Sequence, residues 1–119
     1  MHNYKELKVW QQARILVKQV YLITGGFAKE EKFGITSQIK RSVISIPSNI
    51  AEGAGRKTSK DFGRFLDIAL GSAFELETQI ILSLDLNMIN KTDFDKIDSI
   101  VRQIQKMIYG LRKIWIDLK

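Results

Sequence analysis

Apolar residues in the last third of the sequence recur at alternating steps of three and four, the feature that most constrains its fold. The series continues for about three heptads, the period at which one face of an α-helix packs against a neighbouring helix. A half-buried strand would alternate at every second residue, so this part of the chain is predicted to be helical. The series consists of Phe94, Ile97, Val101, Ile104, Ile108, Leu111, Trp115 and Leu118.

Three earlier segments show the same periodicity, and each is bounded by signals that start or stop helices. The predicted helices cover residues 7–24, 35–52 and about 58–87, and glycines follow the first two. Their predicted core faces comprise Trp10, Ala13, Val17 and Val20 on the first helix; Ile35, Ile39, Val43, Ile46 and Ile50 on the second; and Phe62, Leu66, Ala69, Ala73, Leu76, Ile80 and Leu84 on the third.

Two of the helix starts carry the spacing of a capping box, in which a hydroxyl residue caps the helix and an acidic residue follows three positions later. Thr58 with Asp61 marks the third helix, and Thr92 with Asp95 predicts that the fourth begins just after Thr92. Gly71 lies in the middle of the third helix, where it costs about 1 kcal/mol relative to alanine. Close approach of another helix is the predicted reason for this glycine.

Pro47 falls inside the second predicted helix, where it removes a backbone donor and presses its ring against the carbonyl of Val43. A kink is therefore expected at this point. Short connections between long helices favour antiparallel neighbours. We predict an all-α protein with a single domain over residues 1–119, an antiparallel up-down-up-down four-helix bundle whose second helix is kinked at Pro47.

The formal net charge of +6 is distributed unevenly along the chain. Residues 1–60 carry 11 basic and 4 acidic side chains (+7), residues 61–90 carry 1 and 5 (−4), and residues 91–119 carry 7 and 4 (+3). A basic excess favours polyanionic partners.

Cysteine is absent from the sequence, which excludes disulfides and thiolate metal sites and fits a reducing cytoplasm. No apolar run approaches the ~18 residues of a membrane span, and residues 1–10 do not resemble a signal peptide. A soluble, cytoplasmic protein without a membrane partner is expected.

The inventory of reactive side chains argues against an enzyme or a metalloprotein. His2 is the only histidine, and it lies in an N-terminus that is expected to fray. Glu75 and Glu77 point to different sides of one helix and do not form an acid–base pair. No catalytic residue, cofactor site or metal site is predicted.

Six basic residues flank the Pro47 helix and the turn that follows it, and they are the predicted nucleic-acid-binding residues. Each phosphate that such residues neutralise steepens the salt dependence of binding by about 0.7 to 0.9 log units. The alternative interpretation is a solvated basic face that keeps the protein soluble. The six residues are Lys40, Arg41, Arg56, Lys57, Lys60 and Arg64.

A second candidate is the motif formed by Pro47, Asn49, Glu52 and Gly53. Asn49 and Glu52 are three residues apart and therefore share one helix face. One interpretation is that they bind a ligand, a metal or a neighbouring subunit. The other is structural: the pair satisfies loose backbone groups or binds a basic side chain such as Arg56.

Apolar residues exceed the simple core faces on three of the four helices, which predicts self-association. Trp10 and Trp115, in contrast, fall on the predicted core faces, where packing explains them. The surplus residues are Val9, Leu16, Ile23, Phe65, Ile68, Phe74, Ile100, Met107 and Ile114.

A long central run contains several residues that helical periodicity alone does not require. It reads Ser45-Ile46-Pro47-Ser48-Asn49-Ile50-Ala51-Glu52-Gly53, then Arg56, Phe62, Phe65-Leu66, Ile68-Ala69, Gly71-Ser72, Glu75-Leu76 and Gln79. Preceded by Leu7, Val9-Trp10, Ala13, Phe33-Gly34-Ile35 and Gln38-Ile39-Lys40-Arg41-Ser42, this run resembles the four-helix-bundle family of 23S ribosomal RNA intervening-sequence proteins. The resemblance extends to about residue 89. Two departures are Ala28, where members commonly have proline, and Lys40 in place of an arginine.

The resemblance implies a four-helix bundle without catalytic activity, often a ring-like homopentamer, whose gene sometimes lies inside an insertion in a ribosomal RNA gene. A related branch, the accessory variability determinants of diversity-generating retroelements, binds nucleic acid through basic surface and partners a reverse transcriptase. We therefore hypothesise a non-enzymatic, homo-oligomeric bundle that binds RNA or DNA through basic surface. The alternative is an interaction scaffold or accessory subunit that docks a protein partner such as a reverse transcriptase.

Overall fold

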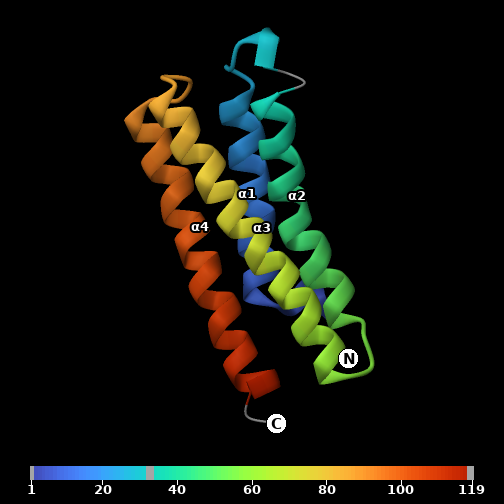
Figure 1. The fold of residues 1–119 in the computed structure, drawn as a ribbon. Coiled ribbons are helices and arrows are strands. Elements are labelled where there is room, and N and C mark those ends of the chain that lie inside the picture. The colour runs from blue at the N-terminus through green and yellow to red at the C-terminus, as the bar shows by residue number, and fades with distance from the viewer. Residues whose placement is uncertain (1, 32–33, 118–119) are drawn as a thin grey trace.

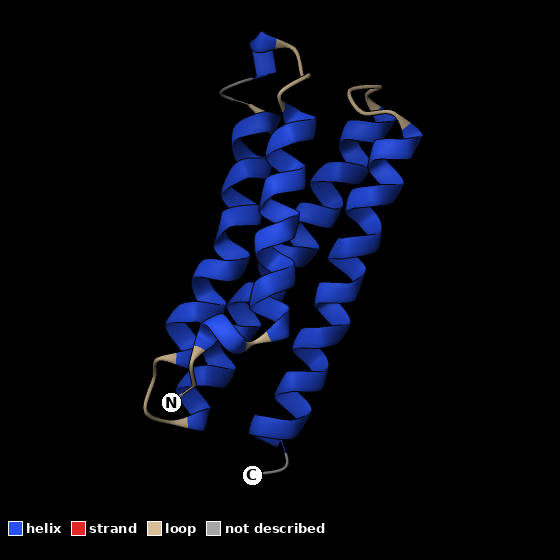
Figure 2. Ribbon diagram, turned by 180° about the vertical axis from the view of Figure 1, so that it is seen from behind, coloured by secondary structure: helices blue, strands red, loops and turns tan. Residues whose placement is uncertain are grey.

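The computed structural model describes residues 2–31 and 34–117, which form four long antiparallel helices (Figure 1), seen from behind in Figure 2. Two short 3-10 helices, η1 and η2, precede α1 and α2, and a π-helical segment, η3, follows α4. The predicted all-α four-helix bundle is confirmed. The elements are η1 (Tyr4–Glu6), α1 (Lys8–Thr24), η2 (Lys29–Glu31), α2 (Ile35–Ala54), α3 (Ser59–Asp85), α4 (Lys91–Arg112) and η3 (Lys113–Asp117).

The helices follow one another around the bundle in chain order. Each contacts its neighbour in the chain, and α1 also contacts α4. The side formed by α1 and α2 therefore lies opposite the side formed by α3 and α4. The α2–α3 turn lies at the end of the bundle that holds both termini, and η2 lies at the other end (Figure 1). None of the described helices combines the length and the apolar character needed to cross a membrane.

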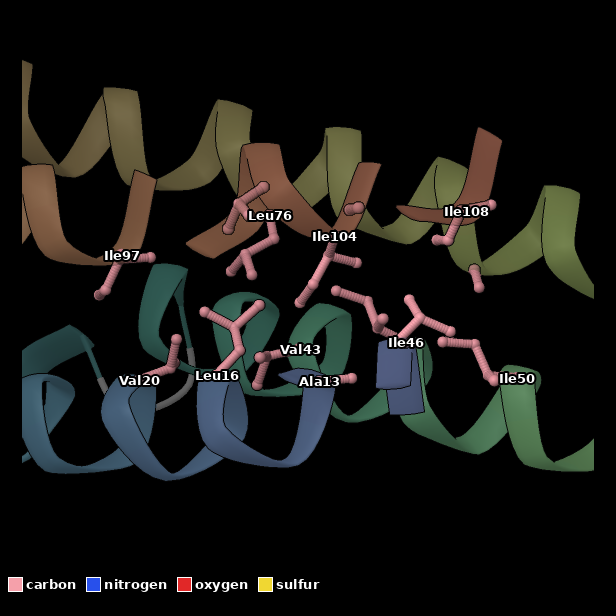
Figure 3. Close-up of a cluster of buried hydrophobic side chains, with 14 of the residues drawn as sticks. Ala13, Leu16, Val20, Val43, Ile46, Ile50, Leu76, Ile97, Ile104 and Ile108 are labelled. Atoms are coloured by element: carbon pink, nitrogen blue, oxygen red, sulfur yellow. The ribbon is translucent and has the colours of Figure 1, made fainter. Parts of the chain in front are cut away.

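The core is a column of aliphatic side chains that runs along the bundle axis (Figure 3). On α4 the predicted series is confirmed over its central part, where Ile97, Val101, Ile104 and Ile108 are completely buried. Toward the C-terminal end of the series the side chains are less buried, since Leu111 and Trp115 are only half-buried. Leu118 lies outside the described residues.

The buried face of α1 differs from the predicted one by one residue. Val9 and Leu16 are buried, whereas Trp10 and Val17 lie at the edge of the core. The buried positions 9, 13, 16 and 20 are separated by steps of four and three residues. The predicted positions 10, 13, 17 and 20 have the same kind of spacing. Periodicity alone does not choose between these two adjacent faces, because the choice depends on where α2 and α4 lie.

Two glycines have roles other than the predicted ones. Gly53 does not end α2, which continues to Ala54; a Cβ atom at position 53 would lie 2.6 Å from the Cβ of Phe65. Gly53 therefore permits close contact between α2 and α3. A Cβ at Gly71 would meet nothing within 4 Å, so no described helix of this chain approaches it, contrary to the prediction. Pro47 lies inside α2, which continues on both sides of it, and the kink stays a prediction.

His2, which was predicted to lie in a frayed segment, instead contacts the end of the bundle. The backbone N–H of His2 donates to the carbonyl of Ala54 at 2.8 Å. The His2 ring lies between two aromatic residues, with centroids 5.0 Å from Phe62 and 4.4 Å from Trp115. This contact joins the N-terminus, the start of α3 and segment η3.

The start of α4 was predicted two residues too late. Asn90 caps the helix, because its Oδ1 accepts the backbone N–H of Asp93 at 2.8 Å. Asn90 and Asp93 have the same spacing as Thr92 and Asp95, and asparagine is the stronger N-cap residue. The predicted cap of α3 is confirmed by a 3.1 Å hydrogen bond from the N–H of Asp61 to the hydroxyl of Thr58.

Replacing Asn90 with alanine is expected to lower the free energy of unfolding by about 1 kcal/mol, because the Asp93 N–H loses its acceptor. Thr92→Ala is the matched control and is expected to change the stability by less than about 0.5 kcal/mol. Urea denaturation of both variants measures the difference. Equal losses would show that Thr92 contributes to the cap after all.

Candidate nucleic-acid interface

The α2–α3 turn brings four of the six predicted basic residues to one end of the bundle. Arg56 and Lys57 lie in the turn itself, and Lys60 and Arg64 lie in the first two turns of α3. All four side chains are exposed. We call this set the turn cluster.

Phe65 supports the two arginines of the turn cluster. The Cζ atoms of Arg56 and Arg64 lie 4.8 and 5.2 Å from the centroid of its ring, and the ring is 7% exposed. Contacts of this kind are worth about 0.5 to 1 kcal/mol at exposed sites. Both guanidinium groups are therefore held near one buried ring and limited in their freedom to move.

Two carboxylates reduce the positive charge around the turn cluster. Glu52 binds Arg56 at 2.9 Å, which is the pairing that the structural interpretation of Glu52 predicts. Asp61 follows within the first turn of α3. Residues 52–64 therefore carry four basic and two acidic side chains, a net charge of +2. Both partners in the Glu52–Arg56 pair are about half exposed, so the pair is a weak contact that a phosphate can replace.

Lys40 and Arg41 lie near the other end of α2, apart from the turn cluster. Arg41 and Arg56 are 15 residues apart in sequence, and the 13 helical steps from Arg41 to Ala54 alone rise about 20 Å along the axis. Lys40 is half-buried, with its Nζ 4.9 Å from the ring centroid of Tyr21 on α1. The structure therefore divides the six predicted residues into two separate groups.

Asn49 is tied into the contact between α2 and α3. Its Nδ2 donates to the carbonyl and the hydroxyl of Ser45 at 2.8 and 2.9 Å. The Ser45 hydroxyl in turn lies 2.8 Å from that of Ser72 on α3. These bonds give Asn49 partners within the protein and link the two helices.

A second polar link lies one turn closer to the start of α2. The Ser42 hydroxyl, 1% exposed, lies 2.6 Å from a carboxylate oxygen of Glu75 and 3.0 Å from the side-chain oxygen of Gln79. The carbonyl of Gln38 also lies 2.9 Å from this hydroxyl. One hydroxyl proton serves one acceptor, so donation to the carboxylate of Glu75 is favoured. Glu77 instead faces α4, where its carboxylate lies 3.5 Å from Arg102. Glu75 and Glu77 thus point to different sides, as predicted.

A groove of about 480 Å³ lies between α1 and α2 and was not predicted from the sequence. Trp10 forms an edge-to-face contact with Tyr4 at 5.1 Å, and the Cζ of Arg14 lies 5.2 Å from the Trp10 centroid. The i, i+4 spacing of Trp10 and Arg14 was the available signal. The groove is lined by Tyr4, Trp10, Arg14, Val17, Lys18, Ile44, Pro47, Ser48 and Ala51.

Histidine and acidic side chains do not gather into a candidate metal site anywhere in residues 2–31 and 34–117. The turn cluster and the α1/α2 groove are two surfaces whose chemistry suggests a binding partner.

Comparison with known proteins assigns the chain to a family. Residues 5–110 match the family described as 23S rRNA-intervening sequence protein. The chain belongs to this family. The matched range includes α1, α2, α3 and nearly all of α4, so the family assignment applies to the whole bundle and to the turn cluster.

The bundle is also similar to a crystal structure at 1.70 Å resolution of a protein of unknown function from Bacteroides thetaiotaomicron, assigned to the S23 ribosomal protein family. The two share 24% sequence identity and superpose with a TM-score of 0.79 over 87% of this chain and 96% of the other. This likeness supports the four-helix fold described above. A comparison with curated protein sequences gives no significant match.

Proposed function

We propose that this 23S rRNA intervening-sequence family member is a non-enzymatic, homo-oligomeric bundle that binds RNA or DNA through the turn cluster. The observation that carries the proposal is the gathering of Arg56, Lys57, Lys60 and Arg64, all exposed, around the start of α3. The N-terminus of a helix attracts anions, and here basic side chains surround it. Phosphate groups are the ligands that suit this arrangement.

The proposed binding depends on the nucleic-acid backbone and not on base sequence. Arginine and lysine contacts to phosphates position a protein on nucleic acid, whereas sequence is recognised through base edges or exposed aromatic rings. Phe65, whose ring contacts both arginines of the turn cluster, is buried beneath Arg56 and Arg64 and does not offer a face for stacking. The expected binding is electrostatic and strongly salt-dependent.

A non-enzymatic role is part of the proposal. The Ser42 hydroxyl lies 2.6 Å from a carboxylate oxygen of Glu75, but its 1% exposure leaves a substrate no access to it. The cysteine-free composition fits action in the reducing cytoplasm. The expected homopentamer rests on the family resemblance, and in a ring each added subunit would strengthen the field of the basic surface.

Reversing the charge of Arg56, Lys57 and Lys60 to glutamate is expected to weaken binding of labelled RNA and duplex DNA about tenfold or more. If each residue neutralises one phosphate, the slope of log affinity against log salt should become shallower by about 2 to 3. The assay is fluorescence anisotropy over a range of salt, with protein freed of co-purified nucleic acid.

The matched control reverses Lys96, Lys106 and Lys113, three exposed lysines on α4 and η3. Each triple variant changes the formal net charge by −6, from +6 to 0, so they differ only in where the charge is removed. Equal losses for both triples would indicate a general charge effect. Unchanged binding by a folded turn-cluster variant would show that the cluster is the wrong site.

An interaction scaffold is the second candidate function, because the α1/α2 groove offers apolar surface to another protein chain. A partner such as a reverse transcriptase would be expected to lose affinity when the groove is altered and to retain it when the turn cluster is reversed. Binding measured against both sets of variants separates the two functions.

A further inference from the structure

The outward face of α3 carries apolar side chains that the fold leaves exposed. Ile68, Phe74, Ile81 and Leu82 are 43–46% exposed although each is large and apolar. Phe74 contributes to a hollow of about 340 Å³ that also includes Tyr109 of α4, so this face extends toward the α3/α4 side of the bundle. We call it the α3 outer face, consisting of Ile68, Gly71, Phe74, Glu75, Ile81 and Leu82.

The charges of the α3 outer face and the α1/α2 groove are opposite. From residue 67 to residue 85, α3 contains four acidic residues and neither lysine nor arginine. Glu77 and Asp67 lie 3.5 and 3.1 Å from Arg102 and Arg112 of α4, so the negative charge that α4 does not offset comes from Glu75 and Asp85, both exposed. The groove contains Arg14 and Lys18 and no carboxylate in its lining. Opposite charges around two apolar surfaces favour their association and suppress pairing of like surfaces.

Gly71 has no explanation within a single chain. Glycine in the middle of a helix costs about 1 kcal/mol relative to alanine, and a Cβ at this position would meet nothing within 4 Å. A missing side chain on an exposed helix face allows the backbone of another helix to approach closely.

We propose that a second copy of this chain places its α3 outer face in the α1/α2 groove. Trp10 to Lys18 on the groove wall and Phe74 to Leu82 on α3 each span eight residue steps, about 12 Å of helix. The apolar side chains of α3 contact Trp10, Val17 and Ile44, while Arg14 and Lys18 lie near the acidic residues that flank them.

The two surfaces belong to opposite sides of the bundle, so the contact is head-to-tail. A head-to-tail contact between two copies leaves one groove and one α3 outer face free. Further copies can bind to these free surfaces until the first and last copies meet and close a ring. This inference rests on the homo-oligomer in the proposed function and specifies which surfaces meet.

Blocking either surface is expected to reduce the mass in solution to that of one chain, 13.7 kDa. Gly71→Trp fills the α3 outer face, and Ile44→Glu places a carboxylate in the groove.

Gly110→Trp and Ile15→Glu are the matched controls: Gly110 also has open space around its Cβ, and Ile15 is 47% exposed against 43% for Ile44. Neither control residue lines the groove or belongs to the α3 outer face, so both controls should keep the wild-type mass. Light scattering measures the masses, and circular dichroism verifies that each variant is folded.

Mixing the two blocked variants provides the sharper test. The Gly71→Trp chain retains an intact groove, and the Ile44→Glu chain retains an intact α3 outer face. An equimolar mixture should therefore form a pair of two chains and nothing larger, since the remaining surfaces are both blocked. An interface that used the same surface on both copies would not produce this pair.

A monomeric wild-type protein, or oligomers that survive both substitutions, would overturn this inference. Loss of nucleic-acid binding by Ile44→Glu with an unchanged mass would also overturn it and would assign the groove to nucleic acid. Mass is measured without nucleic acid, and the turn-cluster titration is separate. Failure of the interface therefore remains distinguishable from failure of the proposed nucleic-acid binding.

Discussion

Replacing Leu76 with alanine is expected to lower the free energy of unfolding by about 2 to 5 kcal/mol, the largest stability effect that we predict. Leu76 is completely buried near the middle of α3, and Figure 3 shows it in the same cluster as Leu16 and Ile104. The truncation removes buried apolar atoms and leaves a cavity inside the core that the four helices share. Because those helices are already packed against one another, they can fill the cavity only in part.

Leu22→Ala is the control for this prediction, because Leu22 is 66% exposed on α1. Its removal is expected to change the stability by less than about 0.5 kcal/mol. Guanidinium denaturation of both variants, followed by helical circular dichroism, gives the two values. A small loss for Leu76→Ala would mean that the core relaxes around the missing side chain far more than a close-packed bundle allows.

The sequence predicts the fold well because it repeats one strong signal four times. The number of helices and the start of α3 follow from periodicity and caps, and the central α4 core residues were identified correctly. The end of α2 and the start of α4 each differ from the prediction by about two residues. The sequence does not predict which of two nearby residues caps a helix or faces the core when both residues have the required spacing. Thr92 and Asn90 both have capping spacing, and Trp10 and Val9 both belong to a helical series.

The error on α1 also explains why the groove was missed. Placing Trp10 on the core face leaves no reason to look for it at the surface. A rotation of one residue moves Trp10 to the edge, beside Arg14 and facing Pro47 of α2. The groove thus depends on how two helices are rotated relative to each other, which local sequence does not encode.

The turn cluster was easier to predict than its separation from Lys40 and Arg41. Arg56, Lys57 and Lys60 are close in sequence and remain close in the structure, because a short turn keeps them together. Lys40 and Arg41 were grouped with them through their position in the Pro47 helix. A helix rises about 1.5 Å per residue, so membership in one helix of this length does not place residues in one site.

Replacing Gly53 with alanine is expected to lower the free energy of unfolding by about 1 to 3 kcal/mol, the second largest effect. Alanine favours helix formation over glycine by about 1 kcal/mol, so propensity alone predicts the opposite sign. Steric contact decides the outcome, because the new methyl group would lie 2.6 Å from the Cβ of Phe65 and 3.1 Å from the ring of Phe62. Neither of these atoms is the far end of a flexible chain, so α2 and α3 must move apart.

Gly55→Ala tests this argument two residues away. A Cβ at Gly55 would come no closer than 3.6 Å to its neighbours, and the backbone φ of −82° suits alanine. This variant should match the wild-type stability or exceed it by up to about 1 kcal/mol. If Gly53→Ala were equally stable, the close contact of α2 with α3 would not be what requires glycine. A loss confined to Gly53→Ala, with weaker nucleic-acid binding in the folded variant, would instead connect this contact to the turn cluster, because Phe65 supports both Arg56 and Arg64.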